Sequence, residues 1–319
     1  MWSCKNCVKI KFVYKKIKGD ILVGKSTFKY DLMLLVVALT WSTGFIGTKY
    51  AQDYGMSSSL IVVFRMLFAS AAMLIIFFPQ IGRLTKVQIK HGVIAGIFMS
   101  AGFLLQTIGM QYTDVSNNAF LTTTNVIFVP FISWLLLKKR PPLKTFLAVA
   151  IGFFGISILT RALDTTISFS LGDILSLLCA ASYAMQIAYI GYAAKESEAA
   201  SFSFVQITVT GVVALVYFLL FEQKASSMPM LGAAVWITLY LGVVCTALPY
   251  WLECTAQKYI PAARSALIIS LEGMFASIIS VLLGLEALTW SLIAGGAIIM
   301  GSIVILEADF RRKKALPRQ

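Results

Sequence analysis

Long apolar runs separated by short polar connections constrain the fold of this chain more than any other feature. A run of about 20 apolar residues crosses the hydrocarbon core of a bilayer as a helix, because a rise of about 1.5 Å per residue matches a thickness of about 30 Å. The runs lack the in-and-out alternation of barrel strands, and lipid admits only helices or closed barrels. The sequence therefore predicts an all-α integral membrane protein.

Composition agrees with this prediction. The chain has 319 residues, of which 59% are hydrophobic and 13% charged, whereas a soluble domain is about half apolar and about a quarter charged. Ten transmembrane helices are predicted, near residues 32–51, 59–79, 91–112, 115–137, 143–160, 171–192, 201–222, 231–252, 260–284 and 287–307.

Basic residues gather in the connections between apolar runs, as they do in cytoplasmic loops. The net charge of +13 is therefore interpreted as a topology signal, and no nucleic-acid partner is expected. The chain is predicted to lie in the inner (plasma) membrane of the cell with both termini cytoplasmic, residues 1–30 forming a basic arm and residues 308–319 a basic tail. The inner connections would hold Arg83, Lys86, Lys90, Lys138, Lys139, Arg140, Lys144, Lys195 and Lys258, whereas the outer loops offer only Arg161 and Lys224 besides Lys49.

The second half of the chain repeats features of the first. The segment that begins at Asp31 before Trp41 parallels the segment that begins at Asp173 before Tyr183. Further matches follow at an offset of about 142 to 147 residues, which indicates duplication of a five-helix unit. Because each unit crosses the membrane an odd number of times, the second copy must be inverted, as in many transporters. The predicted repeats are residues 31–162 and 170–307.

Short motifs in both halves are similar to those of the EamA family of the drug/metabolite transporter superfamily. They include Trp41-Ser-Thr-Gly-Phe, Phe64-Arg65-Met, Gly109-Met-Gln-Tyr-Thr, Leu271-Glu272, Leu285-Glu286 and Gly295 to Gly301. The first copy departs from the pattern at Lys138-Lys139, where the family usually has Gly-Glu. The resemblance covers about residues 31–307 and implies a ten-helix carrier of amino acids, nucleotides, related metabolites or drugs, often an exporter.

Polar residues in the segment 115–137 are the first candidates for a solute site. Asn118, Thr122 and Asn125 share one helical face, and this face must look into the protein because an amide in lipid would lack hydrogen bonds. Two readings are open, namely contacts that join helices or the wall of a solute cavity. Pro130 follows toward the cytoplasm and is expected to permit a bend.

Three charged residues within apolar runs are the next candidates, because such charges need partners or water in a membrane. Arg65 and Glu253 are predicted to be structural or coupling charges. Glu272 corresponds to Asn125 by the repeat, and the two are expected to face each other. Glu272 is either a carboxylate that binds a cation or exchanges a proton, or a structural partner of Arg65 or of nearby hydroxyls.

Aromatic and amide residues in the middle of helices complete the predicted site. Trp41 and Tyr183 are related by the repeat, and Gln106 and Gln186 need hydrogen-bond partners. The predicted substrate-binding residues are Trp41, Gln106, Asn118, Thr122, Asn125, Tyr183, Gln186 and Glu272.

No enzyme activity and no cofactor are expected. The sequence contains no glycine-rich phosphate loop, no His-rich metal spacing and no serine elbow. Cys4 and Cys7 form a lone CxxC without further zinc ligands nearby, so no metal is predicted. The expected partners are a small-molecule solute, the lipid bilayer and a coupling proton or ion, and the chain is expected to be a monomer or a weak dimer.

A secondary transporter that exports small metabolites by alternating access is the leading functional prediction. An importer of a nucleotide derivative or of S-adenosylmethionine is an alternative within transport. A translocase of lipid-linked sugars or a non-transporting membrane scaffold is an alternative of a different class. A polar interior would favour transport, whereas a lateral opening toward lipid would favour the lipid-handling alternative.

Overall fold

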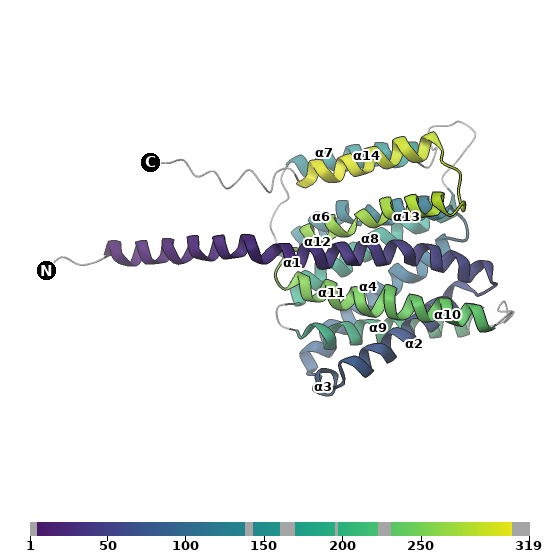
Figure 1. Cartoon of the computed structure of the whole chain (residues 1–319), viewed down its shortest axis with the longest axis horizontal. Coiled ribbons are helices and arrows are strands. Elements are labelled where there is room, and N and C mark those ends of the chain that lie inside the picture. Colours follow the sequence, from purple (N-terminus) through teal and green to yellow (C-terminus); the bar gives the residue numbers. More distant parts are fainter. Residues whose placement is uncertain (1–4, 138–142, 160–169, 195–196, 223–230, 308–319) are drawn as a thin grey trace.

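The computed structural model of the chain describes residues 5–137, 143–159, 170–194, 197–222 and 231–307. These residues form helices and turns, with no strand among them. The helices lie side by side in one bundle (Figure 1). In chain order they are α1 (Lys5–Asp53), α2 (Ser58–Ile76), α3 (Phe78–Ile81), α4 (Lys86–Gly109), α5 (Val115–Thr123), α6 (Asn125–Leu137), α7 (Leu143–Leu159), α8 (Leu171–Ala193), α9 (Ala199–Tyr217), η1 (Phe218–Glu222), α10 (Leu231–Gly242), η2 (Val243–Ala247), α11 (Leu248–Gln257), α12 (Ala262–Ile269), α13 (Leu271–Leu282) and α14 (Trp290–Glu307).

Within the described residues, eight helical stretches are long and apolar enough to cross a membrane. They are Phe28–Asp53, Ser58–Ile76, Lys86–Gly109, Val115–Leu135, Leu171–Ala193, Ala199–Glu222, Gly232–Gln257 and Ala262–Leu282. The other two predicted segments correspond to α7 and α14, whose apolar stretches Ala150–Leu159 and Trp290–Ser302 are shorter. The all-α membrane fold is confirmed, whereas the count of ten spans stays a prediction.

Part of the predicted topology falls on residues outside the described ranges. These include Lys138, Lys139, Arg140, Arg161, Lys195, Lys224, Cys4 and the tail 308–319. The predicted arm 1–30 overlaps the first helix, because α1 begins at Lys5 and continues without interruption to Asp53.

Two of the predicted single helices are interrupted near their middle, at positions that the repeat relates. Thr124 separates α5 from α6, and Ser270 separates α12 from α13. In each case the hydroxyl bonds back to the carbonyl three residues earlier, at 2.6 Å for Thr124 to Leu121 and 2.6 Å for Ser270 to Leu267. Such bonds compete with the helical pattern and bend helices. The bend expected at Pro130 lies instead at Thr124, and α6 continues through the proline.

A third interruption lies in the stretch between α10 and α11. Residues Val243–Ala247 form the π-helical turn η2, and Pro249 follows in the first turn of α11. Proline has no N–H and therefore cannot donate to the carbonyl four residues earlier, which belongs to Cys245. The sequence thus leaves a backbone acceptor without its usual helical donor in the interior of the bundle.

The first helices of the two halves run in opposite directions. The ends of α1 and α4 meet where Gln52 Nε2 donates to the Thr107 carbonyl at 2.7 Å, so these helices run the same way. The start of α4 meets the end of α8 through His91 Nδ1 and the Tyr189 hydroxyl at 2.8 Å, so α8 runs against both. Packing follows the same relation, since α1 packs on α11 and α13 while α8 packs on α4 and α6.

Small residues bring α4 close to its neighbours. Gly92 and Gly96 lie one turn apart on the face toward α9, and a Cβ at Gly96 would approach Val209 to 2.8 Å and the Gln206 carbonyl to 3.0 Å. Close approach of this kind is how helices gain packing contacts in lipid, where no hydrophobic force drives them together.

We predict that Gly96→Leu destabilises the protein, because the larger side chain must push α9 away from α4. Overpacking of a buried contact costs about 1–3 kcal/mol. The melting temperature in detergent is the measurement. Gly232→Leu is the matched control, since a Cβ at Gly232 meets no atom within 4 Å. Equal melting temperatures for the two variants would contradict this packing.

Candidate functional site

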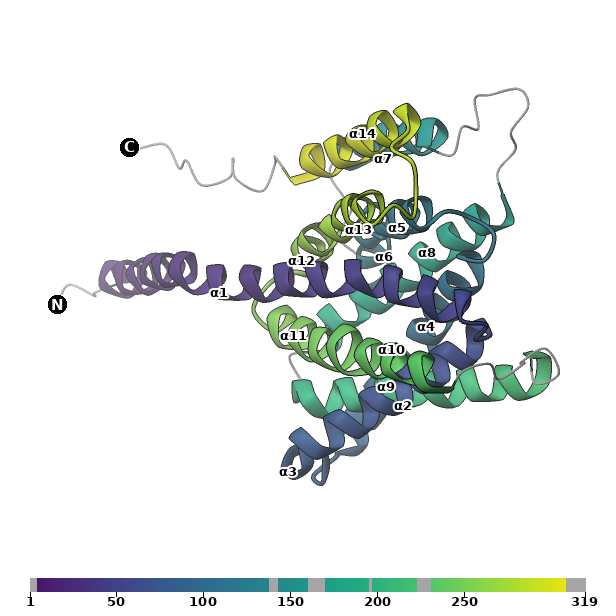
Figure 2. The same ribbon diagram turned by 45° about the vertical axis from the view of Figure 1, so that its right-hand side comes forward.

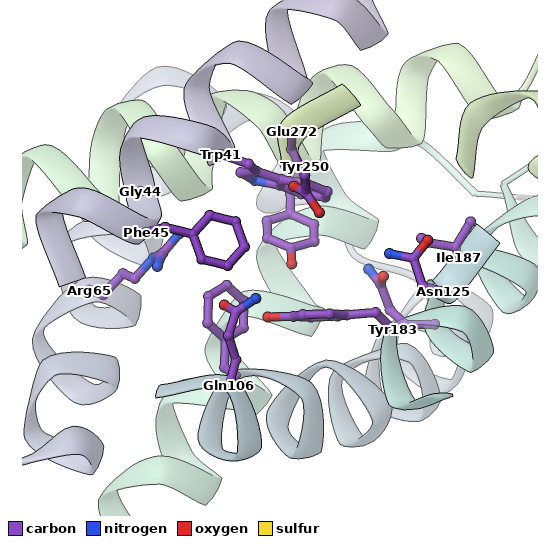
Figure 3. Close-up of a pocket in the computed structure, with 12 residues that line it drawn as sticks. Trp41, Gly44, Phe45, Arg65, Gln106, Asn125, Tyr183, Ile187, Tyr250 and Glu272 are labelled. Atoms are coloured by element: carbon purple, nitrogen blue, oxygen red, sulfur yellow. The ribbon is translucent and has the colours of Figure 1, made fainter. Parts of the chain in front are cut away.

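A small cavity lies between helices of both halves, near the middle of the apolar spans (Figure 3). Its volume is about 30 Å³, which admits about two water molecules because one needs about 10–15 Å³. Figure 3 shows the side chains of Gln106, Asn125, Tyr183 and Glu272 directed toward its centre. The lining residues are Trp41, Gly44 and Phe45 of α1, Arg65 of α2, Phe103 and Gln106 of α4, Asn125 of α6, Tyr183, Gln186 and Ile187 of α8, Tyr250 of α11 and Glu272 of α13.

Arg65 is held in place by the interruption between α10 and α11. Its Nε donates to Thr246 Oγ1 at 2.6 Å, and its Nη2 donates to the Cys245 carbonyl at 2.9 Å. That carbonyl is the one that Pro249 leaves without a helical donor. The guanidinium also lies 4.6 Å from the centre of the Phe103 ring, a distance at which a cation is attracted to the ring face. A buried cation in the membrane thus has both hydrogen-bond and aromatic partners.

Glu272 and Asn125 lie at the two helix interruptions that the repeat relates. Asn125 is the first residue of α6, and Glu272 is the second residue of α13. An acidic group in the first turn of a helix is favoured by the helix dipole. Among the described residues, no hydrogen bond or ion pair within 4 Å involves the Glu272 carboxylate, and Asn125 Oδ1 has no hydrogen-bond partner.

Aromatic side chains form much of the cavity wall. The rings of Trp41 and Tyr250 lie 5.1 Å apart, and Phe103 meets Tyr183 edge to face at 5.7 Å. Trp41 Nε1 is a buried donor without a partner among the described residues. The cavity therefore combines apolar ring faces with a free donor, free acceptors and two charges, which suits a small polar solute with an apolar part.

Seven of the predicted site residues and charges line this cavity, and three do not. Trp41, Gln106, Asn125, Tyr183, Gln186, Glu272 and Arg65 line it, whereas Asn118, Thr122 and Glu253 lie outside.

Asn118 and Thr122 join helices in this structure. Asn118 Nδ2 donates to Ser176 Oγ at 2.8 Å and to the Gln106 carbonyl at 3.2 Å. Thr122 Oγ1 accepts from Gln106 Nε2 at 3.4 Å. Two hypotheses were open for this helical face. Asn118 makes interhelical contacts, as the first expects, and Asn125 lies in the cavity wall, as the second expects.

Several lining residues were not among the predicted site. Gly44, Phe45, Phe103 and Ile187 lie in apolar runs that give no signal in sequence. Tyr250 lies near the end of the predicted helix 231–252, where aromatic residues usually mark the membrane interface. The neighbouring Pro249 was the available signal, because an intramembrane proline marks an irregular backbone, which occurs only inside protein or around a cavity.

These observations describe a multi-pass helical membrane protein with a polar cavity enclosed by its two halves. The sequence model of the EamA-like transporter family matches residues 28–161 and 170–307, so the chain belongs to this family. The resemblance noted from the sequence motifs is thereby confirmed, as is localisation in a membrane.

Relatives with assigned names agree with this family. A protein of Archaeoglobus fulgidus named an uncharacterized transporter is 30% identical over 303 residues, covering 95% of this chain and 93% of its own length. The uncharacterized transporter YoaV of Bacillus subtilis is 22% identical, covering 90% of this chain and 99% of its own. The uncharacterized inner membrane transporter YicL of Salmonella typhimurium is 22% identical, covering 90% of this chain and 98% of its own.

The fold is also present in a solved structure. A crystal structure aligns with 90% of this chain and 99% of its own chain, with a TM-score of 0.69 and 14% sequence identity. The chain is therefore a membrane transporter of the EamA type by family, with relatives that are likewise named transporters.

We predict that Arg65→Lys lowers the melting temperature, because an ammonium cannot reach Thr246 and the Cys245 carbonyl with the planar geometry of a guanidinium. Losing hydrogen bonds of a charged group costs about 1.5–3 kcal/mol each. Thr246→Ser is the control, since it retains the accepting hydroxyl. An unchanged melting temperature for Arg65→Lys would show that the two bonds contribute nothing to stability.

The two asparagines of one segment should behave differently. Asn118→Ala removes bonds between α5, α4 and α8 and is expected to lower the melting temperature. Asn125→Ala removes an amide oxygen that has no partner, and is expected to change solute flux with little change in stability. Melting curves and flux in liposomes for both variants test this, and a reversed pattern would exchange the roles of the two residues.

Proposed function

We propose that this chain is a secondary transporter that moves small metabolites by alternating access. Its architecture would be ten transmembrane helices in two inverted repeats, residues 31–162 and 170–307, with both termini cytoplasmic. The opposite directions of α1 and α8 support the inversion, as do the matched interruptions at Thr124 and Ser270. Basic residues such as Arg83 and Lys86 support the orientation.

The observation that carries this proposal is the cavity with polar lining from both halves. A scaffold protein has no need for unpartnered polar atoms at its centre, and such atoms are costly when no ligand or water satisfies them. Here Trp41 Nε1, Asn125 Oδ1 and Gln186 Oε1 lie buried without partners among the described residues, and all three residues line the cavity.

Contacts between the halves lie near each end of the bundle, on either side of the cavity. At the end where α1 enters the bundle, Arg264 pairs with Asp31 at 2.6 Å, and Tyr30 stacks on Tyr259 with ring centres 4.3 Å apart. At the opposite end, Thr113 Oγ1 donates to Asp173 Oδ1 at 2.7 Å. Asp31 and Asp173 are related by the repeat, so the two contacts are equivalent. A carrier that opens them in turn would expose the cavity to one side at a time.

The charges of the cavity suggest the class of solute. Arg65 is occupied by protein acceptors, whereas the Glu272 carboxylate has no bonded partner in the described chain. We therefore expect Glu272 to bind the cationic group of a solute, with Trp41 and Tyr250 beside its apolar part. Amines such as amino acids, or cationic drugs, fit this lining better than nucleotides do. Export is the proposed direction, and import is the alternative.

A second candidate function is supported by a hollow on the side of the bundle. It has a volume of about 460 Å³ and an apolar lining from α1, α10 and α13 that includes Gly47, Tyr50, Trp236 and Ile279. Thr43 Oγ1 and the Tyr240 hydroxyl, 2.6 Å apart, lie at its lining next to Gly44 of the central cavity. A lateral hollow of this kind would suit a translocase of lipid-linked sugars.

Purified protein in liposomes tests the two functions directly. Uptake of amino acids, nucleosides, cationic drugs and a lipid-linked sugar is measured with and without a pH gradient. Flux of amines supports the proposed transporter, and flux of the lipid-linked sugar alone supports the second candidate. No flux of any compound would overturn the proposal of transport.

For a transported amine, we predict that Glu272→Gln raises KM by about tenfold or more, since losing a charged hydrogen bond costs about 1.5–3 kcal/mol and a factor of ten is about 1.4 kcal/mol. The dependence of flux on pH should persist in this variant. If Glu272→Gln abolished the pH dependence, Glu272 would instead exchange the coupling proton. Asn118→Gln, at a buried position outside the cavity, controls for general damage.

A further inference from the structure

Glu253 is a second buried carboxylate that the cavity does not use. It lies on α11, is fully buried at 0% exposed, and does not line the cavity. Gln257 Nε2 donates to its Oε1 at 2.9 Å, while its Oε2 has no hydrogen-bond partner among the described residues. An ionised carboxylate with a single neutral donor is costly at this depth in a membrane, so its position needs an explanation.

The Glu253 side chain belongs to a polar stripe that begins at the cavity. Tyr250, Glu253 and Gln257 lie at i, i+3 and i+7 on one face of α11, and Tyr250 lines the cavity. Gln257 is the last residue of α11, close to the end of the bundle where Tyr259 stacks on Tyr30. The stripe therefore reaches from the cavity to the end that we assign to the cytoplasm.

Three buried acceptors, two on this stripe and one on α8, have no donor in the part of the chain that the structure describes. Glu253 Oε2, Gln257 Oε1 and Gln186 Oε1 are all buried and all lack a donor within the described chain. The neighbouring Gln206 donates from Nε2 to Cys254 Sγ at 3.5 Å and accepts at Oε1 from Gln186 Nε2 at 3.1 Å. A proton on Glu253 would turn one of these acceptors into a donor.

The surroundings of the two buried carboxylates also favour Glu253 as the site of a proton. Glu272 lines the cavity together with Arg65, whereas Glu253 lies outside it. The other titratable side chains beside Glu253 on α11 are Tyr250 and Cys254, which are buried and carry no positive charge. Among the described residues, no cation forms an ion pair with Glu253 within 4 Å. A buried charge without a partner is neutralised by a proton.

We propose that Glu253 binds the coupling proton of this transporter and that the stripe on α11 connects it to the cytoplasmic end. In the closed structure the Glu253 carboxyl holds the proton on one oxygen. On release, that O–H bond breaks and the proton passes to water. The Gln257 amide serves both states, because its Nε2 donates to Oε1 whether or not Oε2 carries the proton. This inference rests on the proposed transport function.

Infrared spectroscopy of the purified protein tests the proton site without any solute. A protonated carboxylic acid has a C=O stretch that is distinct from that of a carboxylate and shifts on exchange into D₂O. We expect this band at neutral pH in the wild type and in Glu272→Gln, and its loss in Glu253→Gln. Absence of the band from the wild type, or an unchanged band in Glu253→Gln, would overturn the proposal.

A second variant tests the assignment of the band even if Glu253→Gln fails to fold. Gln257→Leu leaves Glu253 in place and removes its hydrogen-bond partner, so the band should move to higher frequency. An unmoved band would overturn the assignment to Glu253. The band should also be insensitive to sodium ions, and its loss on adding sodium would instead make the site a sodium site.

Flux measurements then link the site to transport. For any solute that the liposome assay identifies, Glu253→Gln should abolish the effect of a pH gradient, whereas Glu272→Gln should keep it. Persistence of the gradient effect in Glu253→Gln would overturn the coupling role. The infrared result does not depend on solute movement, so a failed transport assay would count against the proposed function and leave the proton site standing.

Discussion

The need to satisfy backbone hydrogen bonds in a hydrocarbon environment governs the rest of this structure. In lipid an unpaired carbonyl has no water to bond, so an irregular backbone must be enclosed by protein. The interruptions at Thr124, at Ser270 and at Val243–Ala247 all lie in the interior. At the first two, serine or threonine hydroxyls occupy nearby carbonyls, and at the third Arg65 does. The enclosed helix interruptions and the position of Arg65 beside the cavity thus both follow from the need to satisfy backbone hydrogen bonds.

Much of the fold follows from the sequence because its signals are strong and local. Apolar length predicts membrane helices, and the internal repeat relates Asn125 to Glu272, which do line one cavity. The bend expected at Pro130 lies six residues earlier, at Thr124, because the Thr124 hydroxyl bonds back to the Leu121 carbonyl. A proline in the sequence shows that a backbone N–H is missing. The carbonyl to which a threonine hydroxyl bonds can be seen only in the three-dimensional structure.

The site itself was predictable only where polarity stands out from an apolar run. Trp41, Gln106 and Gln186 are unusual in the middle of a helix and were found in this way. Phe103 has the same surroundings in sequence as aromatic residues that face lipid, so its contact with Arg65 could not be anticipated. The sequence also suggested that Arg65 pairs with Glu272. In the structure the guanidinium instead donates to the Cys245 carbonyl, which Pro249 leaves without a helical donor.

The last helix of each half has a role that follows from its position. Figures 1 and 2 show α7 and α14 side by side at one edge of the bundle, and each packs mainly on the other. Their contact is close, because a Cβ at Gly295 would come within 2.6 Å of the Leu159 nitrogen. This seam joins the halves without touching the cavity lining. If the halves rock as proposed while this seam stays intact, the axis of rotation would lie beside α7 and α14.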